Sequence, residues 1–327
     1  MTRTSYLLYK SLRYVISFFV ITTITFLIPR LMPGDPFISI LGKEVYFHSP
    51  DVVRELKSTY GLDRPLPDQY FAFIFNLFHG NLGYSFHYSV PVADILLYKL
   101  MWTLVLLLPS VILGAVFGII LGGICGWKSG SKTDKCLTSG TLFIYSMPHY
   151  WLAMLMVIIF GYYLNLFPLG GITEGGYSGV EKIVDVLWHM CLPVGILTLF
   201  STTFNFLIIR NSVIQFSHED FVLCARAFGL SEWQILWRHV MRNAILPLIT
   251  VIALDFGFMV SGALLVEIIF SWGGMGTLMY DAILVRDYPL LYGIFLLIGL
   301  CVIFANFIAD ILYMVLDPRI KPYSYNE

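Results

Sequence analysis

The sequence predicts an all-α integral membrane protein with six transmembrane helices and an extended extracytoplasmic loop between the first two. Composition is the first observation behind this prediction. Hydrophobic residues make up 58% of the 327 residues, charged residues make up 13%, and the mean hydropathy is +0.78. A water-soluble chain is rarely so apolar. The second observation is that the apolar stretches are long and continuous, without the period-two alternation of a membrane β-barrel, so helices are the predicted spanning elements.

Six apolar stretches are long enough to cross a hydrocarbon core of about 30 Å, for which a helix needs about 20 residues. They are Leu12–Ile28, Leu100–Gly126, Leu137–Leu166, Met190–Ile209, Ala244–Phe270 and Leu290–Leu316. The first follows basic residues, as a secretory signal would, but no small-residue cleavage site comes after it, so we expect it to be retained. The segment Tyr70–Phe78 is aromatic but too short to cross, and we expect it at the membrane interface.

Basic residues predict the orientation of the chain. They gather in the second and fourth connections and in the tail, at Lys128, Lys132, Lys135, Arg210, Arg226, Arg238, Arg242, Arg319 and Lys321. The positive-inside rule then places both termini in the cytoplasm. The predicted domains are residues 1–31 (cytoplasmic N-terminus and first transmembrane helix), 32–98 (extracytoplasmic loop), 99–316 (transmembrane core with a cytoplasmic loop at 211–243) and 317–327 (cytoplasmic tail).

The cytoplasmic loop carries helix start and stop signals. Ser217 and Asp220 have the spacing of a capping box, and Gly229 is the residue type that best tolerates the left-handed end of a helix. Ser231 and Gln234 repeat the capping spacing, so the loop is predicted to be helix, glycine turn, helix. One interpretation is an amphipathic loop on the inner leaflet, anchored by Trp233 and Trp237. The other is a knob for a cytoplasmic partner, in which the small residues Ala225, Ala227 and Gly229 allow close approach.

Glycine also recurs at every fourth position of the second span, at Gly114, Gly118, Gly122 and Gly126. This spacing lines one face of a helix with residues that let a neighbouring backbone approach, which predicts close helix packing in the membrane. A hinge is the alternative interpretation.

Three acidic residues, Asp255, Glu267 and Asp310, fall within or at the ends of the late spans. An acid in a bilayer is costly unless it faces water or a partner, so each is a candidate functional residue. For Glu267 and Asp310 we expect a structural or gating role. Asp255 lies deeper, and it either lines a translocation pathway, where it would attract a cationic group of a solute, or pairs with a partner subunit.

The sequence shows no catalytic or metal-binding pattern. The five cysteines form no CxxC pair, the seven histidines lack metal-ligand spacing, and no nucleophile, base and acid can be grouped. The segment Gly126-Trp127-Lys128 fails the phosphate-loop pattern, because that pattern requires glycine directly before the lysine. We therefore expect a chain that is not an enzyme and that binds no metal or cofactor of its own.

Several ordered segments carry a family resemblance. They are residues 31–36 (LMPGDP), 60–66 (YGLDRPL), 80–85 (GNLGYS), 225–231 (ARAFGLS), 238–239 (RH), 242–247 (RNAILP), 266–267 (VE), 273–276 (GGMG), 286–289 (RDYP) and 317–320 (DPRI). They are spread over about 290 residues of the chain. In this order they resemble the permease subunits of binding-protein-dependent ABC importers, in the first-permease (B-type) branch of the dipeptide, oligopeptide and nickel group.

This resemblance implies a type I importer fold and a specific role for the cytoplasmic loop, which in the family holds the coupling helix that sits in a groove of an ATPase subunit. The residues carried over are Asp220, Phe221, Cys224, Ala225, Arg226, Ala227, Gly229, Leu230 and Ser231. The general importer motif begins with Glu-Ala-Ala and ends in a Leu-Pro pair. Here Leu223 and Cys224 stand in place of the glutamate and the first alanine, and Met241-Arg242 stands in place of the Leu-Pro pair. Any contact that the motif's glutamate makes therefore has no counterpart in this chain.

The resemblance also implies partners and a setting. These are a second homologous permease, two cytoplasmic ATPases that carry ATP and Mg²⁺, an external solute-binding protein and the lipid of a prokaryotic inner membrane, with no nucleic acid. The expected solutes are di- and oligopeptides, and nickel or metal chelates, glutathione and haem are the alternatives. A stand-alone secondary transporter or an intramembrane enzyme is disfavoured, because neither an inverted repeat nor paired catalytic residues are evident.

Overall fold

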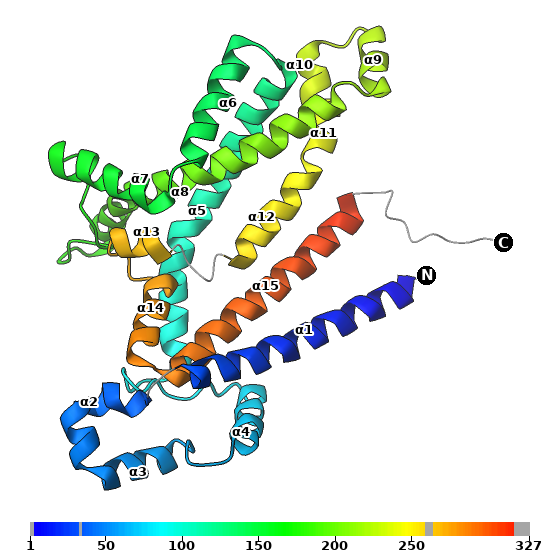
Figure 1. Cartoon of the computed structure of the whole chain (residues 1–327). Coiled ribbons are helices and arrows are strands. Elements are labelled where there is room, and N and C mark those ends of the chain that lie inside the picture. The colour runs from blue at the N-terminus through cyan, green and yellow to red at the C-terminus, as the bar shows by residue number, and fades with distance from the viewer. Residues whose placement is uncertain (1–2, 33–34, 259–263, 317–327) are drawn as a thin grey trace. The chain divides into compact units, whose positions relative to one another are not determined.

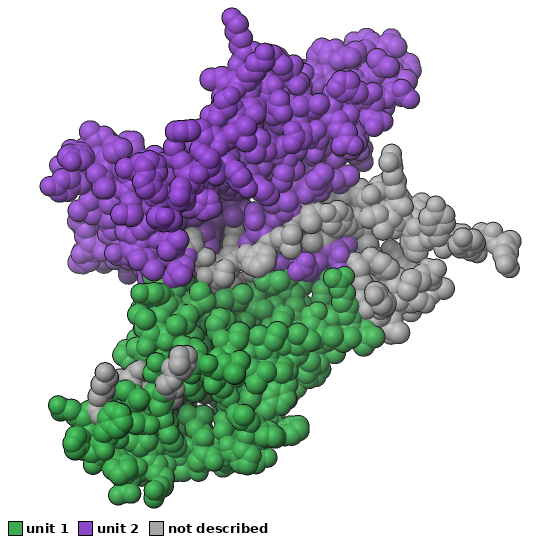
Figure 2. Space-filling model, viewed as in Figure 1, with its two compact units in different colours: residues 1–101, 274–303, 322–327 green, residues 102–273, 304–321 purple. Residues whose placement is uncertain are grey.

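The computed structural model describes residues 3–32, 35–258 and 264–316, and these are nearly all helical (Figure 1). The described ranges contain no named strand, only an isolated bridge between Tyr84 and Pro91. The predicted all-α fold class is confirmed. The chain divides into two compact units, shown in green and purple in Figure 2, and the division falls within two long helices, α5 (Val92–Trp127) and α15 (Tyr288–Leu316).

Unit 1 comprises residues 1–101, 274–303 and 322–327. Its described helices are α1 (Arg3–Leu31), α2 (Pro36–His48), α3 (Pro50–Thr59), α4 (Leu66–Phe78), the start of α5, α14 (Met275–Val285) and most of α15. The long loop predicted at 32–98 is thus itself helical over α2, α3 and α4. Proline supplies or adjoins the first residue of each of these three helices, where its missing N–H costs no helical hydrogen bond.

Aromatic contacts hold α4 against the first helix of unit 1. The Phe26 ring on α1 lies 5.1 Å from that of Tyr70, and the Tyr70 hydroxyl is 2.8 Å from Thr23 Oγ1. Phe71, Phe75 and Phe78 remain exposed on α4. This apolar exposed face suits the interfacial position predicted for Tyr70–Phe78, which stays a prediction.

A buried carboxylate anchors the loop that precedes α5. Asp287, fully buried at the start of α15, accepts hydrogen bonds from the Ser85 hydroxyl, from the backbone N–H of His87 (3.0 Å) and from that of Leu290 (3.2 Å). A buried carboxylate needs such donors to replace water. The Arg-Asp-Tyr-Pro segment therefore ties two loops of unit 1 together.

Unit 2 comprises residues 102–273 and 304–321. It contains the rest of α5, then α6 (Lys132–Tyr145), α7 (His149–Met156), the π-helix η1 (Val157–Tyr163) and α8 (Gly179–Phe216). The short helices α9 (Asp220–Ala227), α10 (Glu232–Gln234), η2 (Ile235–Val240) and α11 (Met241–Ala244) follow. The last helices are α12 (Leu246–Phe258), α13 (Leu264–Ile269) and the end of α15.

The glycine repeat lies where α5 crosses α8. A Cβ atom on Gly118 would come 2.4 Å from the Asn205 side chain, and one on Gly126 would come 2.7 Å from the carbonyl oxygen of Arg210. Gly114 and Gly122 meet α8 in the same way. The predicted packing role of the repeat is confirmed, because only glycine allows the two backbones to approach so closely.

Four helices of the described structure are long and apolar enough to span a membrane: Leu12–Leu31, Val92–Trp127, Gly179–Phe216 and Tyr288–Ile308. They correspond to the predicted first, second, fourth and sixth spans. The predicted span Leu137–Leu166 is not one straight helix, because α6 and the α7–η1 segment meet at an angle of 97°. Pro148, at the break, lacks a backbone N–H and disfavours a helical conformation of the residue before it.

If α6 and the α7–η1 segment cross the membrane together, this bent pair is a fifth span. The predicted span Ala244–Phe270 is described only up to Phe258 and from Leu264, and the predicted tail at 317–327 lies outside the described residues. The count of six spans therefore stays a prediction.

Candidate functional site

The candidate site is the cytoplasmic loop predicted at 211–243, which here begins within α8 and runs through α9, α10 and η2. Helix α9 stands at one end of unit 2 (Figure 1). The predicted capping box at Ser217 and Asp220 is wrong. The Ser217 hydroxyl donates to the Ile214 carbonyl at 2.7 Å in the last turn of α8, and Glu219 is the N-cap residue of α9, without a side-chain cap bond.

The glycine turn after α9 forms as predicted. Gly229 has a φ of +76°, its N–H donates to the Arg226 carbonyl (2.9 Å), and the Leu230 N–H donates to the Ala225 carbonyl (3.2 Å). This pair of bonds is the Schellman motif, which satisfies the last carbonyls of a helix. The turn therefore fixes where α9 ends and how the chain leaves it.

The second capping signature is also confirmed. The Ser231 hydroxyl accepts from the Gln234 N–H at 3.3 Å, and the Ser231 N–H donates to the Gln234 side chain at 3.0 Å. Helix α10 starts here and continues into η2, whose i→i+5 hydrogen bonds make it a π-helix.

An ion pair bridges the glycine turn. Arg226 on α9 donates to the two carboxylate oxygens of Glu232 on α10, at 2.9 and 3.1 Å. The hydrogen bond from Arg226 lowers the pKa of Glu232 from its ordinary value. Exposed pairs of this kind contribute only about 0–1 kcal/mol, so the two parallel bonds act mainly on orientation. The Arg226 guanidinium also lies 5.6 Å from the Trp127 ring of α5.

The inner face of the loop belongs to a continuous apolar core. That cluster joins α8, α9, η2, α11 and α12 through Ile209, Val213, Val222, Ala225, Ile235, Leu236, Val240, Met241, Ala244 and Leu248, all buried. Phe221 and Leu230 pack against it and are half-buried. Helix α9 and the end of α8 therefore share one close-packed core.

The outer face of the loop is apolar and uncovered in this chain. The side chains of Leu223, Phe228 and Trp233 are 60%, 86% and 62% exposed. We call these three residues the apolar crest. Cys224, Ala227, Gly229 and Ser231 are exposed as well, whereas Ala225 is buried and packs the loop from within. Of the three small residues expected to face a partner, Ala227 and Gly229 lie on the surface.

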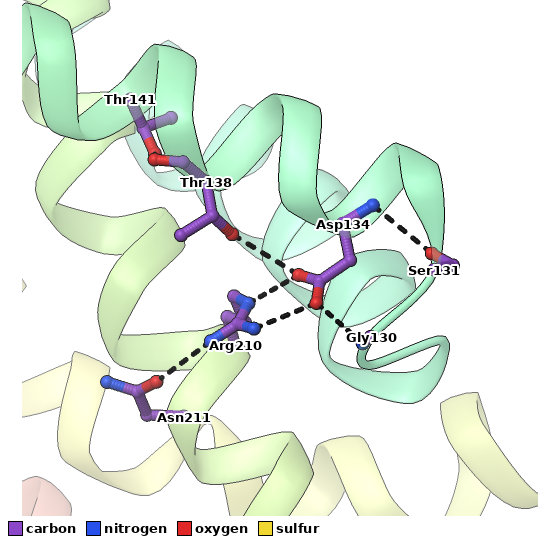
Figure 3. A network of polar contacts seen from close by, with 7 residues as sticks. All are labelled: Gly130, Ser131, Asp134, Thr138, Thr141, Arg210 and Asn211. Carbon is purple, nitrogen blue, oxygen red and sulfur yellow. Dashed lines mark hydrogen bonds and ion pairs between the residues drawn. The ribbon is translucent and has the colours of Figure 1, made fainter.

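A second polar element near the loop was missed from the sequence (Figure 3). Asp134 on α6 is 2% exposed and accepts hydrogen bonds from Arg210 of α8, at 2.5 Å from Nε and 2.8 Å from Nη2. The Gly130 N–H and the Thr138 hydroxyl complete its shell. Removing one partner of such a buried pair costs about 3–5 kcal/mol. Ser131, which accepts from the Asp134 N–H at 3.2 Å, gives the only sequence signal, a capping spacing.

The three membrane acids lie on three different helices. Glu267 on α13 is fully buried and accepts a hydrogen bond from the Thr103 hydroxyl of α5 at 3.0 Å. Asp255 on α12 and Asp310 on α15 are half-buried. Within the described residues, no three His, Cys, Asp or Glu side chains form a group that could hold a metal ion.

The fold and the site define an integral membrane protein whose helical loop presents an exposed apolar face over a buried apolar core. The sequence model of one family, the inner membrane component of binding-protein-dependent transport systems, matches residues 114–322, and the N-terminal model of such components matches residues 3–107. The chain belongs to this family of ABC importer membrane components, and the predicted family is confirmed.

Two relatives illustrate the group. The chain is 32% identical to the dipeptide transport system permease protein DppB of Escherichia coli strain K12, over 93% of this chain and 95% of that protein. It is 33% identical to a putative peptide permease protein of Brucella suis biovar 1, over 92% and 94% of the two chains.

Proposed function

We propose that this chain is one of two permease subunits of an ATP-driven importer that carries di- or oligopeptides across the cytoplasmic membrane. The peptide substrate is supported by the names of the relatives, which align over nearly their whole length. ATP and Mg²⁺ are bound by separate cytoplasmic ATPases, and an external binding protein delivers the solute. Nickel or metal chelates, glutathione and haem are the alternative solutes.

The main support for the proposed mechanism is that the exposed apolar crest lies on a loop whose inner face is packed into the buried core. Leu223, Phe228 and Trp233 supply an exposed surface that a groove of an ATPase would cover, and exposed apolar patches of this kind mark interaction sites. Closure of the ATPases would push α9. Because Val222 and Ala225 pack against Ile209 and Val213, the push would reach α8 rather than bend the loop.

The test is a charge placed on the crest. Phe228→Asp adds a carboxylate at an 86% exposed position, so the fold should survive while the ATPase is lost. We expect at least a tenfold loss of copurified ATPase, because an unpaired charge in an apolar interface costs several kcal/mol. Phe47→Asp, at an exposed phenylalanine of the predicted external loop, is the matched control. Equal copurification of wild type and Phe228→Asp would contradict the proposal.

The membrane acids are proposed to serve translocation. Glu267, fixed by Thr103, would hold α13 on α5, and Asp310 would have a structural or gating role. We assign Asp255 to the solute pathway, where it would attract a peptide amino group. Asp255→Asn should reduce uptake of peptides with a free amino terminus about tenfold and leave N-acetylated peptides unaffected. Equal loss for both peptides would argue for pairing with the second permease instead.

A further inference from the structure

Unit 1 contains an open cavity of about 420 Å³ that neither the coupling loop nor the membrane acids use. Its walls come from the end of α1, the turn between α3 and α4, α4 itself, the loop before α5 and the start of α15. The residues that matter here are Arg30, Arg64, Gln69, Asn76, Tyr288 and Tyr292. Cavities of about 300–1,000 Å³ are the usual size of small-ligand sites.

Arg30 brings a partly buried cation to this cavity. Its Nε and Nη2 donate to the Gln69 side-chain oxygen at 3.2 and 2.7 Å, and its Nη1 donates to the Phe26 carbonyl (3.1 Å) and to the Tyr292 hydroxyl. The guanidinium carbon lies 3.6 Å from the centre of the Phe26 ring. These contacts use four of the five N–H donors of an arginine, and every acceptor is neutral.

The charge of the cavity is unbalanced. A second arginine, Arg64, lines it, and the described residues of its lining include no aspartate or glutamate. Among the residues that the structure describes, Arg30 has no ion pair with a carboxylate. A cation that is taken from water without a counter-charge is costly, and an anionic ligand would remove that cost.

The remaining lining can hold the oxygens of an anion. Tyr60, Tyr84, Tyr288 and Tyr292 give aromatic walls with hydroxyl groups, and Asn76 and Asn81 give amide donors. Arginine is the residue that best matches the planar oxygen pairs of phosphate and carboxylate groups. We propose that this cavity is a binding site for a phosphate group, carried either by an anionic phospholipid headgroup or by a soluble phosphate.

Binding of a phosphate group here is independent of the transported solute, so the test needs no transport assay. The full chain is purified in detergent, delipidated and titrated with short-chain phosphatidylglycerol, with phosphatidylcholine of the same chain length and with inorganic phosphate, and bound ligand is counted by native mass spectrometry. The choline group adds a positive charge that two arginines disfavour, so phosphatidylcholine serves as the weak lipid probe.

Arg30→Gln and Arg64→Gln are compared with Arg54→Gln, an exposed arginine of α3 outside the lining. Arg64 is exposed, so its replacement keeps the fold even if Arg30→Gln does not. We expect each lining variant to bind about tenfold more weakly, as loss of a charge-assisted hydrogen bond predicts, and Arg54→Gln to bind as wild type.

The outcomes distinguish a lipid headgroup from a soluble phosphate, or they show that the cavity is not a phosphate site. Preference for phosphatidylglycerol that both lining variants lose identifies a headgroup site, and phosphate binding without lipid preference identifies a soluble ligand. Absence of binding in the wild type, or equal binding in wild type and Arg64→Gln, would show that Arg30 only latches α1 to α4 and α15, and would overturn the proposal.

Discussion

At Gly229 the backbone takes a left-handed conformation, and a Cβ there would meet nothing within 4 Å. The constraint on this residue is therefore the backbone angle and not space. An L-residue in that conformation costs about 1 kcal/mol or more. Gly118 is the opposite case, with an ordinary backbone and no room for a side chain. Two glycines of one chain are thus needed for different reasons, one for its backbone angle and the other for its small size.

A further residue-scale feature is the ion pair in the external loop. The Asp35 carboxylate accepts from Lys57 at 2.5 Å, from the Tyr46 hydroxyl at 2.9 Å and from the Phe37 N–H at 3.0 Å. Burial raises the pKa of Asp35, but these hydrogen bonds outweigh it, and the pKa lies below the ordinary 3.8. The hydrogen bond to Asp35 raises the pKa of Lys57 above 10.5.

These shifts predict how the loop responds to pH. A lowered carboxyl pKa stabilises the folded loop above about pH 3.8, and the effect is lost as the pH falls through the lowered value. Because the pKa of Lys57 is raised, its ion pair stabilises the folded loop up to about pH 10.5. This stabilisation is lost as the pH rises through the raised pKa. Lys57→Gln removes the main donor, so its acid unfolding should start at a higher pH than that of the wild type.

The measurement is the thermal unfolding midpoint between pH 3 and pH 8. Arg54→Gln, which replaces an exposed cation of α3, is the control and should follow the wild type. An identical acid profile for Lys57→Gln and the wild type would contradict the role assigned to this pair.

At the scale of elements, the crossing of α5 and α8 predicts a steep dependence on side-chain size. Gly118→Ala would place its Cβ 2.4 Å from the Asn205 side chain, so the two helices must separate. We expect a loss of about 1–3 kcal/mol in the free energy of unfolding, the usual cost of overpacking. Gly195→Ala on α8, where the new Cβ meets nothing within 4 Å, is the matched control and should be neutral or slightly stabilising.

Denaturation in detergent, followed by tryptophan fluorescence, checks this prediction. If Gly118→Ala and Gly195→Ala unfold alike, α5 and α8 are not packed as closely as described here.

At the scale of the whole molecule, the predicted orientation puts the coupling loop and the loop 32–98 on opposite sides of the membrane. A variant that keeps Cys224 alone, with the other four cysteines changed to serine, has one exposed thiol on α9. In sealed right-side-out vesicles, a membrane-impermeant maleimide should label Cys224 only after permeabilisation. Glu55→Cys in the same background should be labelled at once. Immediate labelling of Cys224 would contradict the predicted orientation.

The sequence alone predicted the features that depend on near neighbours along the chain. Apolar runs indicated four helices long enough to span a membrane, Gly229 gave the end of α9, Ser231 gave the start of α10, and the glycine repeat gave a closely packed face of α5. Each follows from helix period, capping or residue size along a single segment of the chain. The same reasoning failed at Ser217, because its hydroxyl bonds back into α8 rather than forward into α9.

Tertiary structure decided what depends on residues far apart. Asp134 and Arg210 are 76 positions apart and meet only because α6 lies against α8, and Ala225 turns inward because the core beneath α9 is built by α8, η2 and α11. The cavity around Arg30 likewise needs segments from α1 to α15. Local sequence determines which helices form and where they end. The burial of a charge or a side chain is a property of everything packed around it, which only the folded chain supplies.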